Sequence, residues 1–149
     1  MHEFTQEVEE LAKAVMEYSL ERLKSNPPLD GPRSEQDLYA ELGNTITPQG
    51  LGGKQTLKVF TETLALACIS TDHPRNLAFI PSAPSEYANL FDLVVGASSL
   101  YGGSWQEGAG AVFAENQALK WLIDIAGLPK SAGGVFVQGG TMGNLSALV

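Results

Sequence analysis

The final stretch, from Gly133 to Val149, constrains the fold more than any other part of this chain of 149 residues. The β-branched and aromatic residues 135–137 predict a short buried strand. The glycine-rich residues 138–141 predict a tight turn, and an apolar helix is expected from Asn144 onward. A strand, a glycine turn and a helix N-terminus bring backbone N–H groups and the positive end of a helix together, which predicts an anion site.

The residues of this turn leave two interpretations open, an anion site and a simple tight connection. A tight connection from strand to helix needs glycines even when it binds nothing. The turn lacks the Gly-Lys-Ser/Thr sequence of a Walker loop and the Gly-x-Gly-x-x-Gly spacing of dinucleotide-binding folds. Thr141 adds a hydroxyl donor beside the backbone N–H groups, which suits a phosphate monoester without being specific to one.

Composition excludes several classes of partner and compartment. The formal net charge of −8 argues against a nucleic-acid-binding surface, which needs clustered Lys and Arg. No signal peptide is visible, and no uncharged run approaches the roughly 18 residues that span a bilayer. The single cysteine, Cys68, lies in an apolar run and is predicted to be a buried core thiol. Without a disulfide framework, a reducing cytoplasm is the simplest compartment.

Ahead of the final stretch the chain is rich in helix patterns. The first predicted helix carries an apolar stripe that needs a partner, either the chain's own core or a second subunit. Ser34 and Asp37 resemble a capping box, and Gly43 and Gly127 are expected to close helices. The predicted helices cover residues 3–24, about 35–42, 54–69, about 84–100 and about 108–126.

The final stretch also predicts that more sequence is needed to complete a domain. A three-residue strand is not stable without neighbouring strands, and no other segment is a convincing partner. A helix of about two turns is marginal by itself. We therefore expect the chain to be a fragment, or the ordered part, of a longer α/β protein.

Few side chains form a chemical pattern. His73, which follows Asp72, is interpreted as a base, a ligand or a loop histidine bonded to its neighbour. Glu107 and Glu115 are interpreted as surface or capping groups. His, Cys and Asp show no metal-ligand spacing, so no metal site is predicted.

Three stretches resemble one enzyme family. Residues 135–148 are similar to the phosphate-loop segment of the group II pyridoxal-phosphate-dependent amino-acid decarboxylases, which include the aromatic-L-amino-acid and glutamate decarboxylases. Asp72-His-Pro-x-x-x-x-Phe-Ile-Pro-Ser82 agrees independently. Gly103-Ser-Trp105, followed by Glu115-Asn-Gln-Ala-Leu-Lys-Trp-Leu122 and Gly127-Leu-Pro129, is the third stretch. All three occur in the family's order and cover roughly residues 35–149.

The resemblance implies an α/β fold of type I, a PLP-dependent transferase-like fold with a mainly parallel sheet in its large domain. Residues 1–80 would form a helical N-terminal segment that wraps over the partner subunit of a homodimer. Residues 81–149 would be the start of the large domain, incomplete here. In this chain the expected content is the helical segment plus the first strand, turn and helix of that domain.

The resemblance also assigns site residues. Gly140 and Thr141 match positions that hold the cofactor phosphate, and Gly139 lies beside them. A loop that lines the substrate pocket corresponds to Phe79, Ile80 and Pro81, with Ser82 next to it. Trp105 matches a link near that pocket. These positions imply the cofactor pyridoxal 5′-phosphate (PLP) and a small-molecule substrate that is an amino acid.

The implied reaction is α-decarboxylation, in which the cofactor acts as an electron sink after loss of carbon dioxide. The Schiff-base lysine, the carboxylate for the ring nitrogen and the stacking histidine lie beyond residue 149 in this family, so no catalytic residue is expected in this chain. Two departures stand out: Met142 replaces a frequent acidic residue, and Ile80 stands where aromatic-specific members tend to have a ring. The alternatives are another PLP-dependent lyase, an aldehyde-forming enzyme of the same fold, or a helical interaction module.

Overall fold

The structure is a computed structural model that describes residues 3–29, 31–79 and 84–149. It forms two compact units, Met1–Asn89 and Leu90–Val149. The predicted boundary between residues 80 and 81 lies outside the described residues and stays a prediction. No helix in the described part of the chain combines the length and the apolar character that crossing a bilayer requires.

Helix α1 spans Gln6–Lys24 and begins where the chain first offers a cap. The N–H of Val8 donates to Oγ1 of Thr5 at 3.3 Å, so the helix starts three residues later than the predicted residue 3. Glu7 and Glu9 occupy the first turn, and Arg22 and Lys24 the last. These charges complement the helix dipole.

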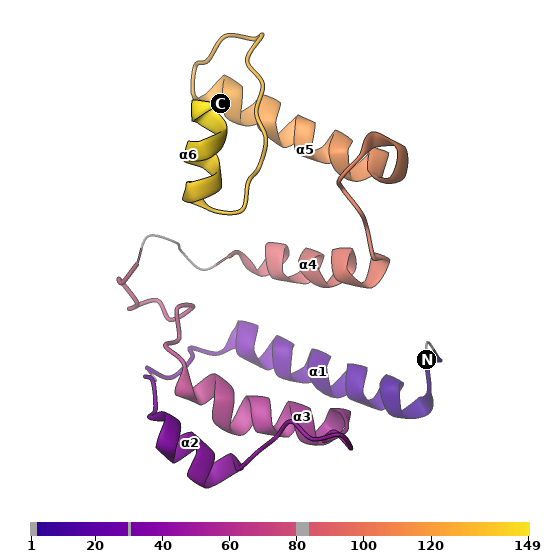
Figure 1. The fold of residues 1–149 in the computed structure, drawn as a ribbon, viewed down its shortest axis with the longest axis vertical. Helices are drawn as coiled ribbons and strands as arrows, with labels where there is room; N and C mark the ends of the chain where they lie inside the picture. The colour runs from indigo at the N-terminus through magenta and orange to yellow at the C-terminus, as the bar shows by residue number, and fades with distance from the viewer. Residues whose placement is uncertain (1–2, 30, 80–83) are drawn as a thin grey trace. The chain divides into compact units, whose positions relative to one another are not determined.

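Helix α1 packs on α3, Gly53–Val59, and the two run side by side in Figure 1. At Gly53 a Cβ atom would lie 2.4 Å from Cδ2 of Leu11, so the absence of a side chain permits this close approach. Nζ of Lys54 donates to Oε2 of Glu10 at 2.7 Å. This contact lowers the pKa of Glu10 and raises the pKa of Lys54.

The helix that begins as α3 continues with a changed hydrogen-bond pattern. It becomes a π-helix, η1, at Phe60–Leu64 and a 3₁₀-helix, η2, at Ala65–Ala67. The ring of Phe60 meets that of Tyr18 edge to face, with centroids 6.4 Å apart. The predicted helix over 54–69 is thus present over 53–67, ending before Cys68.

Cys68 corrects a prediction. The thiol is exposed instead of buried, because the chain leaves the helix at this residue with extended dihedral angles, φ −108° and ψ 156°. Its Sγ lies 3.3 Å from the carbonyl oxygen of Leu64. The apolar run around Cys68 therefore did not indicate burial of this residue.

Helix α2, Glu35–Leu42, has the predicted capping box and glycine end. The N–H of Asp37 donates to Oγ of Ser34 at 3.1 Å, and the Ser34 hydroxyl donates to Oδ2 of Asp37 at 2.6 Å. Gly43 ends the helix with φ 62°. Near its C-terminus, Glu41 accepts hydrogen bonds from the buried Thr63 of η1 and pairs with Arg33, both at 2.7 Å.

The remaining helices are α4, Glu86–Ser98; α5, Trp105–Ile125; and α6, Gly140–Leu148. Helix α5 begins at Trp105, directly after the cap Ser104 and three residues before the predicted start, and Gly127 follows its end with φ 65°, as expected. On these helices Ile123 is the one described side chain that is buried. Most apolar side chains on these helices thus remain uncovered.

No strand is assigned anywhere in residues 3–29, 31–79 and 84–149. The predicted strand over 135–137 is therefore not formed: the segment lies between α5 and α6 without secondary structure (Figure 1). The physical reason is the one the sequence raised, because a strand exists only when a neighbour pairs with it. The helical part of the predicted fold is present.

Candidate functional site

Gly139 sets the geometry of the predicted anion site. It precedes α6 with φ 87° and ψ 166°, a region that essentially only glycine adopts. The N–H of Gly143 donates to the carbonyl oxygen of Gly139 at 3.2 Å, which is the first bond inside the helix. The N–H groups of Gly140, Thr141 and Met142 therefore have no backbone acceptor in the described part of the chain.

The start of α6 corrects the predicted boundary. Helical structure begins at Gly140 and not at Asn144, because the turn is completed by Gly139 alone. Gly140 and Thr141 thus belong to the first turn of the helix. This shift favours the predicted chemistry, since N–H groups of a first helical turn point together along the axis toward a ligand.

A phosphate fits this helix end. Nothing lies within 4 Å of the position that a Cβ atom would take at Gly140. Thr141 is exposed, and its hydroxyl has no hydrogen-bond partner among the described side chains. Three N–H donors and one hydroxyl match the acceptor oxygens of a phosphate monoester.

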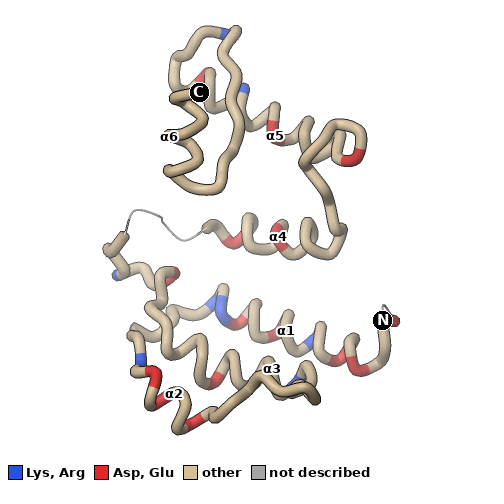
Figure 2. The backbone as a smooth tube through the Cα atoms, in the orientation of Figure 1, with Lys and Arg blue, Asp and Glu red and all other residues tan. Residues whose placement is uncertain are grey.

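Charge at this helix end comes from the backbone alone. Residues 133–149 contain no charged side chain, and Figure 2 shows α6 without either charge colour. The positive end of the helix dipole is worth roughly half an elementary charge. The site therefore offers hydrogen-bond geometry, while the other groups that neutralise a phosphate dianion must come from elsewhere.

The segment that leads into the site is held by α5. The N–H of Phe136 donates to Oε1 of Glu115 at 3.2 Å. Gly134 passes so close to α5 that a Cβ atom there would lie 3.0 Å from Cδ2 of Leu119. Glu115 and Leu119 are four residues apart and thus share one face of the helix.

Glu115 is a residue whose role the sequence interpretation missed. It was expected to be a surface or capping group. The sequence did contain a sign of this role, because Glu115 lies four residues before the apolar Leu119. An acid on the apolar face of a helix needs a hydrogen-bond donor. The backbone N–H of Phe136 is that donor.

Trp105 is the first residue of α5 and its side chain is 61% exposed. Ser104 caps the helix: it accepts from the N–H of Glu107 at 3.4 Å and donates to the Glu107 carboxylate, so Glu107 lies in the capped first turn of α5. Gly108 departs from helical angles with φ −126° and ψ 35°. Trp105 precedes Glu115 by ten residues on α5, and the kink at Gly108 lies between them.

Phe79 belongs to the first unit and carries an unusual backbone conformation. Its φ is 67° and its side chain is 73% exposed. A left-handed aromatic residue is a genuine outlier, and such residues concentrate at functional sites. The other predicted pocket residues, Ile80, Pro81 and Ser82, lie outside the described residues.

Of the three interpretations of His73, this structure supports the loop histidine bonded to its neighbour. Its Nδ1 accepts a hydrogen bond from the N–H of Arg75 at 2.9 Å. The imidazole therefore belongs to the local turn, as a loop histidine bonded to its neighbour. Asp72, beside it, contacts α1 through Arg22.

Comparison with known proteins agrees with the motifs. An aromatic-L-amino-acid decarboxylase of Bacillus atrophaeus is 33% identical over 130 residues, which cover 87% of this chain. An L-2,4-diaminobutyrate decarboxylase of Acinetobacter baumannii is 23% identical over 116 residues, or 78% of this chain. The chain is similar in sequence to these two amino-acid decarboxylases. The predicted resemblance to this family is confirmed.

The chain spans about a quarter of the length of these curated relatives, 27% and 23% respectively. No protein-family model matches the chain, and no solved structure matches it significantly. The relationship to this decarboxylase family accordingly rests on the sequence similarity to the two named enzymes.

Proposed function

We propose that the chain is the N-terminal part of a PLP-dependent amino-acid decarboxylase, which releases carbon dioxide and an amine. The observation that carries the proposal is the start of α6, where three N–H groups without a backbone acceptor among the described residues lie in the same helical turn as the hydroxyl of Thr141. The two decarboxylase relatives support the same reaction class. When bound, PLP would supply the electron sink for the charge left by carbon dioxide loss.

The residues of this chain would bind and orient the cofactor. Gly140, Thr141 and Met142 would donate their N–H groups to the phosphate, and Gly139 would give the backbone the turn that exposes them. The Thr141 hydroxyl would add a fourth donor. The proposed catalytic lysine, carboxylate and histidine belong to other parts of the protein.

Substrate contacts would come from the loop that contains Phe79, with Ile80, Pro81, Ser82 and Trp105 as further candidates. The two relatives are named for an aromatic and a diamino substrate, so the similarity favours an L-amino acid without choosing its side chain. Phe79 supports a pocket role through its exposed ring and left-handed backbone.

We also propose a type I fold, a homodimer and a cytoplasmic location for the whole protein. The apolar stripe of α1 supports the dimer, because the side chains of Val8 and Val15 are 41% and 39% exposed, and Phe4, just before the helix, is 72% exposed. Exposed apolar surface of this kind is typical of an interface. Residues 135–137 support the type I fold, because they retain the composition of a strand that lacks its neighbours.

The proposal is tested with the full-length protein. Carbon dioxide release is measured with L-amino acids that carry aromatic, acidic and basic side chains. The 149-residue chain alone is expected to release none. Activity of the full-length protein on none of these substrates would exclude the proposed reaction.

The phosphate site is tested separately by PLP affinity. Thr141→Val removes the hydroxyl and retains the shape, and is expected to weaken PLP binding about tenfold or more, as for a lost hydrogen bond to a charged group. Thr141→Ser retains the hydroxyl and is the matched control. Equal affinity of both variants and the wild type would remove Thr141 from the site.

A further inference from the structure

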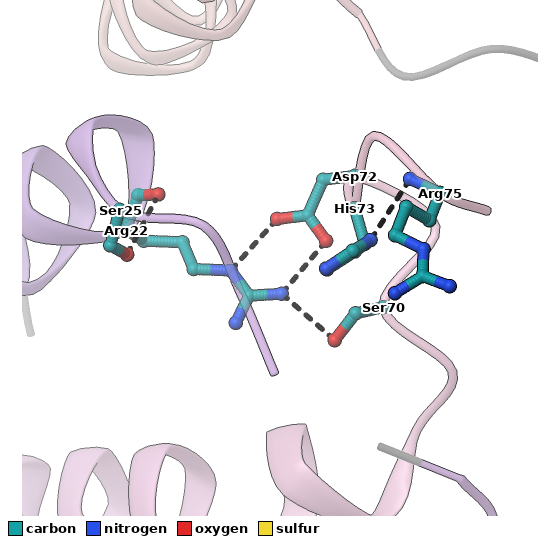
Figure 3. A network of polar contacts seen from close by, with 6 residues as sticks. All are labelled: Arg22, Ser25, Ser70, Asp72, His73 and Arg75. Carbon is teal, nitrogen blue, oxygen red and sulfur yellow. Dashed lines mark hydrogen bonds and ion pairs between the residues drawn. The ribbon is translucent and has the colours of Figure 1, made fainter. Parts of the chain in front are cut away.

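Arg22 of α1 binds Asp72 side-on across 50 residues of sequence. Its Nε donates to Oδ2 and its Nη2 donates to Oδ1, both at 2.8 Å. Figure 3 shows the two parallel contacts. Only the planar fork of an arginine makes this geometry, because a lysine is a single point charge.

The pair is partly shielded from water. The Arg22 and Asp72 side chains are 27% and 40% exposed, below the values of the lysine pairs on α1. Nη2 of Arg22 also donates to Oγ of Ser70 at 3.3 Å, and Ser70 is buried. Partial shielding and two-oxygen binding make such a contact stronger than an ordinary surface ion pair.

Asp72 belongs to a turn that is held together by its own backbone hydrogen bonds. The N–H of His73 donates to the carbonyl oxygen of Ser70 at 3.1 Å, and the N–H of Asn76 donates to that of His73 at 2.8 Å. These bonds join residues 70–76 into one folded unit. Within residues 3–29 and 70–79, Arg22 provides the described hydrogen bonds between α1 and this loop.

We propose that Arg22 is a positioning residue, which fixes the base of loop 70–79 through Asp72 and so places Phe79 for substrate. This inference rests on the proposed function, in which the Phe79 loop lines the substrate pocket. In this role Arg22 would act without contacting substrate or cofactor. Its effect passes through the turn at residues 70–76.

The first test measures loop order in the full-length protein. Arg22→Lys retains the charge and loses the side-on geometry, so hydrogen exchange at the amides of His73 and Asn76 is expected to become about five- to thirty-fold faster. Arg75→Lys is the matched control, because Arg75 lies in the same loop and has no ion pair in the described part of the chain. Unchanged exchange in Arg22→Lys would overturn the restraint.

A charge-swapped double variant distinguishes loss of the Arg22–Asp72 pair from a general loss of folding. The double variant Arg22→Asp, Asp72→Arg places the guanidinium on the loop and the carboxylate on α1. Hydrogen exchange at the amides of His73 and Asn76 is expected to be slower in this double variant than in Arg22→Asp alone. Two single variants and a double variant that all exchange equally fast would show that the pairing itself does not order the loop.

The second test uses the full-length enzyme. Arg22→Lys is expected to raise KM for the amino acid several-fold and to change kcat less, since a misplaced loop weakens substrate binding. Arg75→Lys is expected to leave both constants within about twofold. Faster exchange with an unchanged KM would overturn the positioning role. A wild-type enzyme without activity would instead exclude the proposed function. Amide hydrogen exchange would still show whether Arg22 restrains loop 70–79.

Discussion

The backbone N–H of Phe136 donates a hydrogen bond to Oε1 of Glu115 at 3.2 Å, although the residues are 21 positions apart. The bond joins α5 to the segment that enters the proposed phosphate site. A carboxylate that accepts from a backbone N–H makes a charge-assisted bond, which is stronger than a neutral one. Glu115 therefore holds the approach to Gly139 in place from a neighbouring helix.

Replacement of Glu115 by alanine is expected to release this segment. The Phe136 amide would lose its acceptor, and its hydrogen exchange would become faster by about five- to thirty-fold. Glu115→Gln keeps a side-chain oxygen at the same position and is the control, with exchange close to that of the wild type. If Glu115→Ala exchanges as slowly as the wild type, the bond does not order the segment.

Gly108 and Gly110 provide a matched pair within α5. A Cβ atom at Gly108 would lie 2.0 Å from the backbone carbonyl oxygen of Tyr101, while nothing lies within 4 Å of that position at Gly110. Gly108→Ala is expected to destabilise the protein by about 1–3 kcal/mol, because backbone atoms must move. Gly110→Ala is expected to stabilise it by up to about 1 kcal/mol through helix propensity.

Urea unfolding followed by helical circular dichroism measures both changes. The comparison is internally controlled, since both substitutions add the same methyl group to the same helix. Destabilisation by Gly110→Ala equal to that by Gly108→Ala would show that the Tyr101 contact is not the cause.

Local features of the fold were predictable from sequence, and distant contacts were not. The cap formed by Ser34 and Asp37 spans three residues, so the sequence pattern contains the whole interaction. The Arg22–Asp72 pair joins residues 50 apart, and nothing in either neighbourhood indicates the other. A strand at 135–137 was predicted from composition, but its formation depends on partner strands.

Within the candidate site, the helix boundary was not predictable from sequence. The glycines and Thr141 predict a phosphate site by type and order, and that assignment stays a prediction. The start of α6 at Gly140 depends on the dihedral angles of Gly139, which a run of glycines leaves free. Cys68 shows the same limit, because burial depends on where the helix ends.

Gly139 and Gly140 allow the backbone of the site to be tested. Alanine at residue 139 would be held at φ 87° and ψ 166°, at a cost of about 1–3 kcal/mol. Gly139→Ala is expected to unwind the first turn of α6 and to weaken PLP binding in the full-length protein. Gly140→Ala should retain the helix, because its Cβ atom would meet no neighbour.

The two substitutions are compared by PLP titration and by amide chemical shifts of residues 140–143. Helix loss in Gly139→Ala with retained helix in Gly140→Ala is the expected pattern. Retention of helix and PLP affinity in Gly139→Ala would show that the left-handed glycine is not required.

Glu41 predicts how stability depends on pH. The hydrogen bond from Thr63, followed by that from Arg33, lowers the pKa of Glu41 below its ordinary value of 4.5. The folded state therefore binds a proton at this carboxylate less readily than the unfolded state. The stabilisation is fully present above pH 4.5 and is lost as the pH falls through the lower pKa of the folded state.

Glu41→Gln retains an oxygen that accepts from Thr63 and removes the titration. Urea unfolding is measured between about pH 6 and pH 3, a range that includes the ordinary pKa values of carboxylates. The free energy of unfolding is expected to fall less steeply with pH in this variant than in the wild type. Glu17→Gln is the control, because the Glu17 carboxylate on α1 has no hydrogen bond or ion pair to any described residue. Equal pH dependence in Glu41→Gln and the wild type would contradict the assignment, whereas a flattened curve in Glu17→Gln as well would indicate net charge as the cause.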